Sequence, residues 1–506
     1  MDITTENTGE GLLYQYLANI IITISGMFFY LYTIHYFNTD VVGLFSLLLA
    51  IASLFNILFS LGFPAAISHF ISYSIGRRYS GDIKKIIKYG ILIGLSISLI
   101  SFLFVFSFSE YISNLFFHNE YDLYLKLLSF DISLMVLNNF LVSILFGLQK
   151  FKYVSIVQSS GNLISYFSGF IIYQFIHILY IIIIGWILGN FIITIFSIIL
   201  IIIYDKNIKV DNQNEFNIKK MFAYSIPIYA SNILGYGATY VDRFVVSYFL
   251  NLSDFGIYSL AILMVTALGF LQGPLNNVLL PKFSKFFGEN DLYSLKLYSS
   301  KAFIYILIIN VSLTFILAGL SPWIIIFISN ENYLQAAIPF TIISIIISIS
   351  LSGGVLYVEI QSVRRNWIFV ISSLVAILTN VTLCFALIPN YKLIGAGIAF
   401  SISTLIYTII LLSYTLKLNI FKLDITNIIK IYISGLIVFL ILIFIQKFLF
   451  YSTIKLFLLI IFGYSIYILL IRNFRILKEE DLEIIKSITP KKFYKIVEFF
   501  EILLFS

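Results

Sequence analysis

Long apolar stretches recur along the chain and alternate with short polar segments. Each is close to or above the roughly 20 residues that an α-helix needs to cross a bilayer core of about 30 Å. The stretches are continuous and rich in Ile, Leu and Phe, whereas strands of a membrane barrel alternate apolar and polar residues. We therefore predict an all-α polytopic membrane protein with about fourteen transmembrane helices, over residues 11–37, 42–75, 89–109, 127–148, 154–175, 178–203, 224–250, 255–280, 302–328, 334–359, 367–388, 393–415, 430–450 and 452–471.

The chain repeats itself at an offset of 213 residues without gaps. The matched pairs are Tyr16 and Tyr229, Asn19 and Asn232, Ile20 and Ile233, Asn38 and Asn251, Gly43 and Gly256, Ser46 and Ser259, and Leu47 and Leu260. Each copy holds six apolar stretches, and an even number returns the chain to its starting side, so both copies insert in the same orientation. Parallel repeats of this kind are typical of transporters with a substrate path at the repeat interface. We predict four parts: an N-terminal six-helix lobe (1–212), a C-terminal six-helix lobe (213–416), two further helices (417–472) and a cytoplasmic amphipathic tail (473–506).

Composition and charge support a membrane protein and not a nucleic-acid-binding one. Hydrophobic residues make up 60% of the chain and charged residues 11%, with a net charge of +7. When alternate connections are counted, 27 of the 32 Lys and Arg residues fall on one side. Short loops rich in Lys and Arg remain in the cytoplasm, so this count predicts a multi-pass cell-membrane protein with both termini inside.

The sequence offers little material for enzymatic chemistry. Cys384 is the single cysteine, and neither a phosphate-binding Gly-rich Lys motif nor a His-Glu-x-x-His or Asp-x-Asp motif occurs. The outer loops are short, and the longest runs from about Glu110 to Lys126. We expect a protein that is not an enzyme, with neither a cofactor nor a bound metal.

Polar residues inside the spans predict a substrate path, because such residues usually face the bundle interior or water. In the stretch 224–250 they follow helical spacing and form one face that ends at Arg243. A matching face lies in 11–37, where Tyr30 stands at the position of Arg243. We predict that both faces line the path through Asn19, Tyr30, Asn232, Tyr236, Tyr240 and Arg243.

Alternatives remain open for these and other polar residues. Arg243 can bind an anion in the path, anchor at the membrane interface or pair with an acidic neighbour. Asp242 is a second candidate for the path, although its small-residue face fits a buried hydrogen-bonding role better. Further candidates for sugar binding, or for polar contacts between helices, are Asn138, Gln158 and Asn162.

Two other acidic residues and several prolines carry separate expectations. We expect Asp131 at the membrane interface near Lys126, and Glu359 in a surface ion pair with the neighbouring arginines. Prolines can kink helices and allow a transporter to bend. The hinge candidates are Pro64, Pro227, Pro274 and Pro281.

Several segments together resemble a known family. They are Ser225-Ile-Pro-Ile-Tyr, Val241-Asp242-Arg243, Asp254-Phe-Gly256-Ile-Tyr258-Ser-Leu-Ala261, Leu280-Pro281-Lys-Phe-Ser284, and in the first copy Tyr36-Phe-Asn-Thr-Asp-Val-Val-Gly43-Leu-Phe and Leu61-Gly-Phe-Pro64-Ala-Ala. They resemble the polysaccharide-transporter branch of the multidrug/oligosaccharidyl-lipid/polysaccharide (MOP) flippase superfamily. The resemblance covers nearly the whole chain and implies two six-helix lobes around a central cavity, with alternating access.

The resemblance implies a flippase that turns a polyprenyl- or dolichyl-phosphate-linked oligosaccharide, or polysaccharide repeat unit, from the inner to the outer leaflet. Its expected partners are the lipid-linked oligosaccharide and membrane lipids, with a coupling cation and glycan-assembly proteins as further candidates. One alternative is a cation-coupled multidrug or metabolite exporter of the same superfamily. An alternative of another class is a membrane-embedded glycan polymerase or ligase, which would need a large catalytic outer loop.

Overall fold

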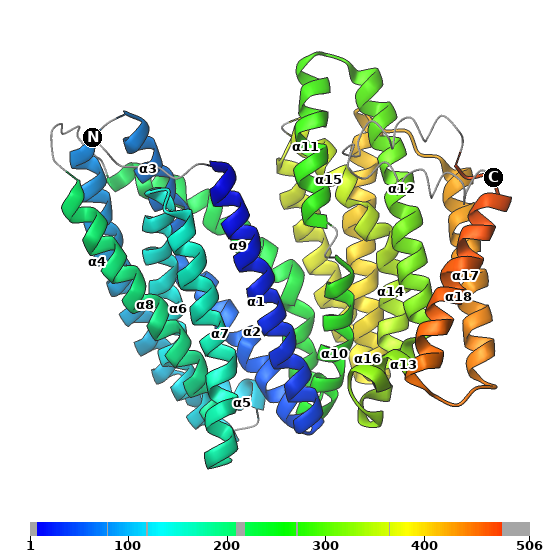
Figure 1. The fold of residues 1–506 in the computed structure, drawn as a ribbon, viewed down its shortest axis with the longest axis horizontal. Helices are drawn as coiled ribbons and strands as arrows, with labels where there is room; N and C mark the ends of the chain where they lie inside the picture. The colour runs from blue at the N-terminus through cyan, green and yellow to red at the C-terminus, as the bar shows by residue number, and fades with distance from the viewer. Residues whose placement is uncertain are drawn as a thin grey trace. The chain divides into compact units, whose positions relative to one another are not determined.

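The protein is all-helical over the part of the chain that the structure describes. The computed structural model (Figure 1) describes residues 8–77, 79–117, 120–208, 218–269, 272–363 and 365–477, and the regular elements in these ranges are all helices. The all-α prediction is therefore confirmed for these residues. Of the predicted amphipathic tail, residues 478–506 lie outside the described ranges.

The chain divides into two compact units, residues 1–248 and 249–506. Helices of the first unit are α1 (Thr8–Tyr36), α2 (Thr39–Ser60), α3 (Phe63–Arg77), α4 (Ser80–Ser107), α5 (Ser109–Phe117), α6 (Asp122–Gly147), α7 (Phe151–Ile176), α8 (Ile181–Asn207) and α9 (Ile218–Phe249). Helices of the second are α10 (Leu252–Leu268), α11 (Gln272–Gly288), α12 (Leu292–Gly319), α13 (Ser321–Ile328), the 3₁₀ helix η2 (Glu331–Ala336), α14 (Ala337–Ser352), α15 (Gly354–Ser362), α16 (Trp367–Lys417), α17 (Ile425–Gln446) and α18 (Thr453–Asn473).

Ten helical segments among the described residues are long and apolar enough to cross a membrane. They are 17–36, 39–60, 80–107, 122–147, 181–206, 292–319, 331–362, 367–417, 425–446 and 453–473. The protein is therefore a multi-pass membrane protein, and the fourteen-span arrangement remains a prediction.

Several predicted helices are broken where the backbone cannot stay helical. The stretch 42–75 forms α2 and α3, because Leu61 and Gly62 have positive φ angles of 49° and 71°. The stretch 302–328 divides at Leu320, beyond which a proline occupies the first turn of α13, where its missing N–H has no helical partner to lose. The stretches 367–388 and 393–415 both lie within the bounds of α16, but the backbone leaves the helical conformation at Lys392 (φ 48°, ψ −127°), so they form two helices as predicted.

Matched positions of the sequence repeat carry the same local structure. Asn38 caps α2 and Asn251 caps α10, each with its side-chain oxygen accepting a hydrogen bond from the backbone N–H three residues on. The backbone angles of the two caps agree within one degree, at φ −74° and −73° with ψ 170° in both. The equivalent residues therefore begin a helix in the same way in both halves.

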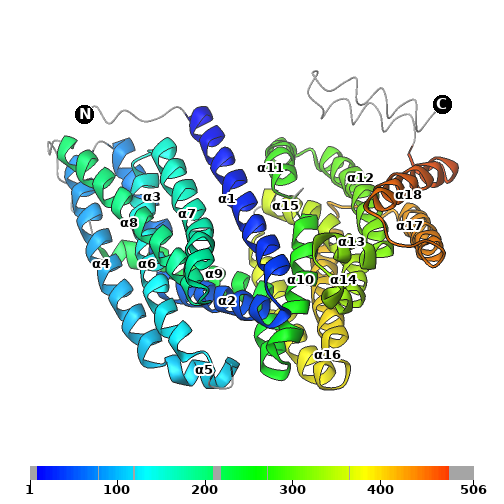
Figure 2. The same ribbon diagram turned by 60° about the horizontal axis from the view of Figure 1, so that its bottom comes forward.

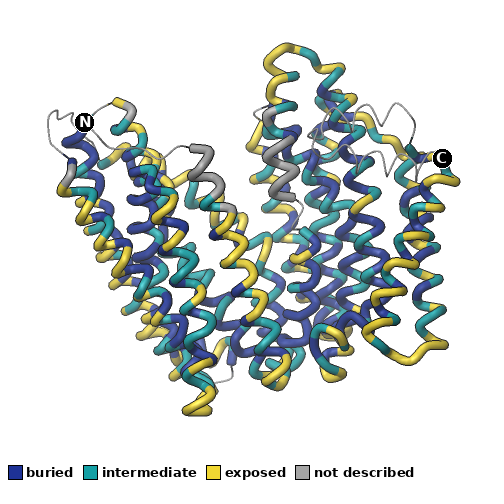
Figure 3. The backbone as a smooth tube through the Cα atoms, in the orientation of Figure 1, coloured by how far each residue is buried: buried dark blue, intermediate teal, exposed yellow. Residues whose placement is uncertain are grey.

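The core of the first unit lies around α6, which packs against α2, α3, α4 and α8. Figure 2 shows α6, α7 and α8 beside one another. In the most apolar stretch of each helix, 67% of the residues are buried in α6 but only 28% in α4. In Figure 3 exposed positions recur along the outer edge of this unit, where α4 and α8 overlap in the view. This pattern fits a helix that presents one face to lipid.

Glycines let α7 and α8 approach closely. A Cβ atom at Gly169 would lie 2.9 Å from the backbone of Ile182, and one at Gly185 would meet the backbone of Gly169. Small residues at such a contact allow two membrane helices to pack backbone against backbone. The α7–α8 pair is therefore packed backbone against backbone within the first unit.

Candidate functional site

Two tyrosines of α9 attach this helix to α2 within the first unit. Tyr229 Oη donates to the Leu58 carbonyl at 3.0 Å, and Tyr236 Oη donates to the Ala50 carbonyl at 2.6 Å. The two tyrosines are seven residues apart, which is about two helical turns, so both point to the same side of α9. Leu58 lies in the last turn of α2, where carbonyls lack helical partners, and Tyr229 satisfies one of them.

The turn between α2 and α3 lies directly against the backbone of α9. A Cβ atom at Gly62 would meet the Ser225 carbonyl oxygen and would lie 3.0 Å from the Tyr229 backbone nitrogen. Gly62 also has a φ of 71°, which residues with a side chain adopt only with strain. Both the contact and the conformation therefore require glycine here.

Arg243 lies at the end of a stack of aromatic rings along α9, formed by Tyr236 and Tyr240, which we call the aromatic column. Its guanidinium carbon lies 4.3 Å from the centroid of the Tyr240 ring, an arrangement that allows a cation–π interaction. Tyr240 in turn stacks on Tyr236, with ring centroids 4.5 Å apart and planes 13° apart. Since Tyr236 is buried and bonded to α2, the column fixes the position of the arginine.

The buried Nε of Arg243 is a donor that no described residue uses. Arg243 is half-buried, and its Nε is buried without a hydrogen-bond partner in the structure. Within the described ranges, the recorded ion pairs involve other residues than Arg243. A buried donor without a partner costs roughly 1–3 kcal/mol, a cost that a bound anion would remove. Asp242 beside it is fully buried.

The remaining residues of the predicted faces divide into exposed and buried ones. Asn232 on α9 and Asn19 on α1 are exposed. Tyr30 is half-buried and accepts a hydrogen bond from Ser46 Oγ at 3.4 Å. The structure thus leaves the two asparagines available to a ligand, whereas Tyr236 and Tyr30 have partners within the first unit.

Asn138 belongs to a buried polar cluster between α6 and α8. Its Nδ2 donates to the Asn190 carbonyl at 2.9 Å, and its Oδ1 accepts from Thr194 Oγ1 at 2.8 Å. Asn190 Nδ2 donates to Asp131 Oδ1 at 2.8 Å. We call these four residues, Asp131, Asn138, Asn190 and Thr194, the α6–α8 cluster.

The α6–α8 cluster corrects one expectation from the sequence. Asp131 is only 3% exposed and lies inside the unit, so the prediction that it sits at the membrane interface is wrong. The hydrogen bond from Asn190 replaces part of the hydration that the carboxyl group loses on burial. The sequence signal was Asn190 itself, a polar residue within the apolar stretch 178–203 that we did not single out.

Glu359 requires a second correction. It is fully buried in α15, whereas we expected a surface ion pair with the adjacent arginines; Arg365 is exposed. The expectation failed because proximity in sequence at a helix end does not determine which way each side chain points.

Gln158 and Asn162 lie on α7, both half-buried. Asn162 Nδ2 donates to the Gln158 carbonyl of its own helix at 2.8 Å. Nearby, Gln15 Nε2 of α1 donates to Ser155 Oγ at 2.8 Å and joins the two helices. Part of this polar face therefore serves contacts between helices.

The proline candidates occupy different helical positions. Pro64 lies in the first turn of α3, just after the break at Leu61 and Gly62. Pro227 lies inside α9 and is exposed. Pro274 and Pro281 fall within the bounds of α11. Among the described residues, no group of three or more His, Cys, Asp or Glu side chains could hold a metal ion.

The sequence of this chain matches the profile of the family described as "Polysaccharide biosynthesis protein" over residues 8–287. The chain belongs to this family. No curated protein matches it significantly.

Solved structures with the same fold are MOP-superfamily transporters. A lipid II flippase MurJ in an inward closed conformation is 19% identical, with a TM-score of 0.68 over 92% of this chain and 98% of that one. An inward-facing multidrug resistance MATE family transporter is 14% identical, with a TM-score of 0.64 over 79% and 94%. A MOP superfamily transporter from Pyrococcus furiosus, described as having a binding pocket of reverse polarity, is 13% identical with a TM-score of 0.52 over 81% and 93%. The family and the MOP fold inferred from the sequence are confirmed.

Proposed function

We propose that this protein is a flippase that moves a lipid-linked oligosaccharide, or a polysaccharide repeat unit on a polyprenyl or dolichyl phosphate carrier, from the inner to the outer leaflet. Arg243 is the observation that carries the proposal. It is a half-buried cation in a family of polysaccharide biosynthesis proteins, held by aromatic rings and with an unused donor. Its planar donor fork suits the oxygens of a phosphate or pyrophosphate linkage.

Such a protein must lower the free-energy barrier that keeps polar headgroups from crossing the membrane. Sugar hydroxyls and phosphates cannot enter hydrocarbon cheaply, because they lose water without replacement partners. A polar surface that opens first to one side and then to the other removes this barrier, while the isoprenoid tail stays in lipid. In this mechanism Arg243 binds the anionic linkage, and the exposed Asn19 and Asn232 donate and accept hydrogen bonds with sugar hydroxyls.

The proposed topology follows from the distribution of basic residues. With most Lys and Arg residues in the cytoplasm, both termini face the cytoplasm and the two six-helix repeats share one orientation in the cell membrane. In this arrangement Pro64 and Pro227 are the positions at which the helices bend during alternating access.

The decisive experiment is leaflet-resolved translocation of a fluorescent lipid-linked glycan in proteoliposomes. Arg243→Ala should reduce the rate by at least about tenfold, since losing a charged hydrogen bond costs roughly 1.5–3 kcal/mol. Arg243→Lys keeps the charge without the planar fork and should give an intermediate rate. Wild-type protein that leaves the glycan in its original leaflet would exclude the flippase proposal. Normal translocation by Arg243→Ala would exclude only the role of this residue.

A second candidate function is cation-coupled export of a drug or metabolite, and the α6–α8 cluster is the observation in its favour. Its buried carboxyl group, Asp131, lies in the first unit and accepts a hydrogen bond from the side-chain amide of Asn190. Asp131→Asn retains an oxygen acceptor for Asn190 but removes the charge. If a proton or sodium gradient drives wild-type transport and this variant loses the response, Asp131 has a coupling role; an unchanged response excludes it.

A further inference from the structure

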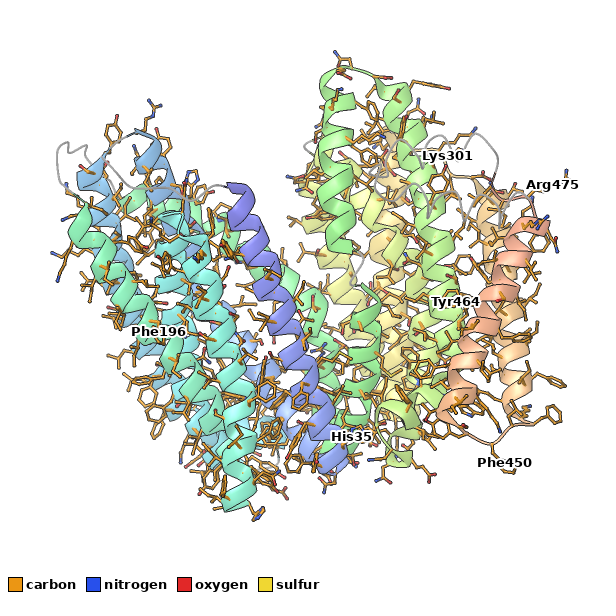
Figure 4. The ribbon with its side chains drawn as sticks, in the orientation of Figure 1. His35, Phe196, Lys301, Phe450, Tyr464 and Arg475 are labelled. Atoms are coloured by element: carbon orange, nitrogen blue, oxygen red, sulfur yellow. The ribbon has the colours of Figure 1, made fainter. Side chains whose placement is uncertain are left out.

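A cavity in the second unit gathers lysines at one end of three apolar helices. It has a volume of about 370 Å³ and lies between the start of α12, the segment before α17 and the segment after α18. Figure 1 shows these three parts at the same end of the unit, and Figure 4 labels Lys301 on α12. Its polar lining includes Tyr293, Lys296, Lys301, Lys422, Asp424 and Asn427.

The charge of this cavity is positive. Three lysines line it, against one aspartate. The carboxylate of Asp424 caps α17, accepting from the Asn427 backbone N–H at 3.1 Å and from Asn427 Nδ2 at 2.8 Å. The negative charge is thus engaged at a helix start, where the positive end of the helix dipole already favours it.

Hydrogen bonds between separate elements position two of the three lysines. Lys296 Nζ donates to Asn419 Oδ1 at 2.6 Å, and the Lys422 backbone N–H donates to Ser300 Oγ at 2.8 Å. Lys430 Nζ donates to the Phe474 carbonyl at 3.0 Å and so attaches the end of α18 to α17. The cavity is therefore a built feature of the fold and not a chance gathering of surface lysines.

The apolar part of the lining indicates the type of ligand. Ile304 and Ile476 are buried, and Leu297 adds a further aliphatic side chain. α12, α17 and α18 are each apolar enough to cross a membrane, so the cavity at their ends lies at headgroup depth. Basic pockets between transmembrane helices at this depth suit anionic lipid headgroups.

We propose that this cavity binds the phosphate of an anionic membrane phospholipid, with Lys296, Lys301 and Lys422 around the headgroup and the first acyl carbons against Leu297 and Ile304. Free phosphate shares the charge chemistry, but it would gain nothing from the aliphatic lining. The site is separate from Arg243, which lies in the first unit, and does not depend on the proposed transport activity.

The test measures lipid retained by the full-length protein during delipidation in detergent, using native mass spectrometry. Phosphatidylglycerol should remain bound, and phosphatidylcholine should not. Lys296→Gln, Lys301→Gln and Lys422→Gln combined should reduce phosphatidylglycerol retention about 100-fold, because each lysine near an anionic headgroup contributes a factor of about five. The corresponding triple Arg variant should retain it.

A matched triple variant, Lys84→Gln, Lys85→Gln and Lys88→Gln on α4, removes three lysines outside the cavity and should leave retention unchanged. Equal losses in both Gln triples, or no loss in the cavity triple, would overturn the proposal. So would equal retention of phosphatidylcholine, or displacement of the lipid by millimolar inorganic phosphate. If the cavity triple does not fold, Lys422→Gln alone should cause about a fivefold loss, and an unchanged value would overturn the proposal.

Discussion

The guanidinium of Arg243 lies over the ring of Tyr240 at 4.3 Å, so the orientation of the proposed anion-binding group depends on its aromatic neighbour. A cation–π contact is worth about 0.5–2 kcal/mol, depending on how far it is removed from water. Tyr240→Leu should therefore reduce translocation about 2- to 30-fold while Arg243 is still present. Tyr240→Phe keeps the ring and should remain close to wild type in the same proteoliposome assay. A loss with Phe equal to that with Leu would mean that the hydroxyl group matters and not the ring.

Gly62 provides a prediction for stability. In Gly62→Ala the new methyl group would meet the α9 backbone, and the left-handed conformation would add about 1–2 kcal/mol of strain. We expect a clearly lower Tm for the purified protein in detergent. Gly235→Ala is the matched control, because among the described residues no atom beyond its own turn of α9 lies within 4 Å of its Cβ position. It should leave the Tm unchanged or raise it, since alanine favours helix more than glycine does. Equal effects of the two variants would contradict the packing of α9 against the α2–α3 turn.

The tyrosine contacts between α9 and α2 should each contribute measurably to stability. Tyr229→Phe and Tyr236→Phe remove one hydrogen bond each, at 3.0 and 2.6 Å, and retain the rings. Each should lower the free energy of unfolding by about 0.5–1.5 kcal/mol. The stack of Tyr236 on Tyr240 survives in the Phe variant. Denaturation in mixed micelles measures both values, and no loss in either variant would argue against these bonds.

The α6–α8 cluster should tolerate loss of the Asp131 charge better than loss of the Asp131 oxygen that accepts from Asn190. Asp131→Leu leaves Asn190 Nδ2 without its partner in the buried cluster, at a cost of about 1–3 kcal/mol. Asp131→Asn keeps an oxygen for the same bond and should unfold at a temperature much nearer to wild type. Thermal unfolding in detergent compares the two. A Tm for Asn no higher than that for Leu would contradict the role of the acceptor oxygen in the cluster.

The sequence by itself determined which segments are helical and what class of protein they form. Continuous apolar runs can bury their backbone polar groups in lipid only as helices, and this physical requirement acts on each segment independently. Local chemistry also sufficed for helix starts, as the capping residues Asn38 and Asn251 illustrate. The family followed from short motifs around Gly, Pro and the pair Asp242–Arg243, which the family match supports.

Only the tertiary structure decided what each polar side chain contacts. Helical spacing placed Tyr236 and Arg243 on one face, but it could not indicate that α2 would accept a hydrogen bond from Tyr236 while Arg243 kept a donor unused. Asp131 became a core residue because Asn190, 59 residues away, supplies its partner. Such contacts join helices that are distant in sequence, and periodicity within one helix carries no information about the helix that packs against it.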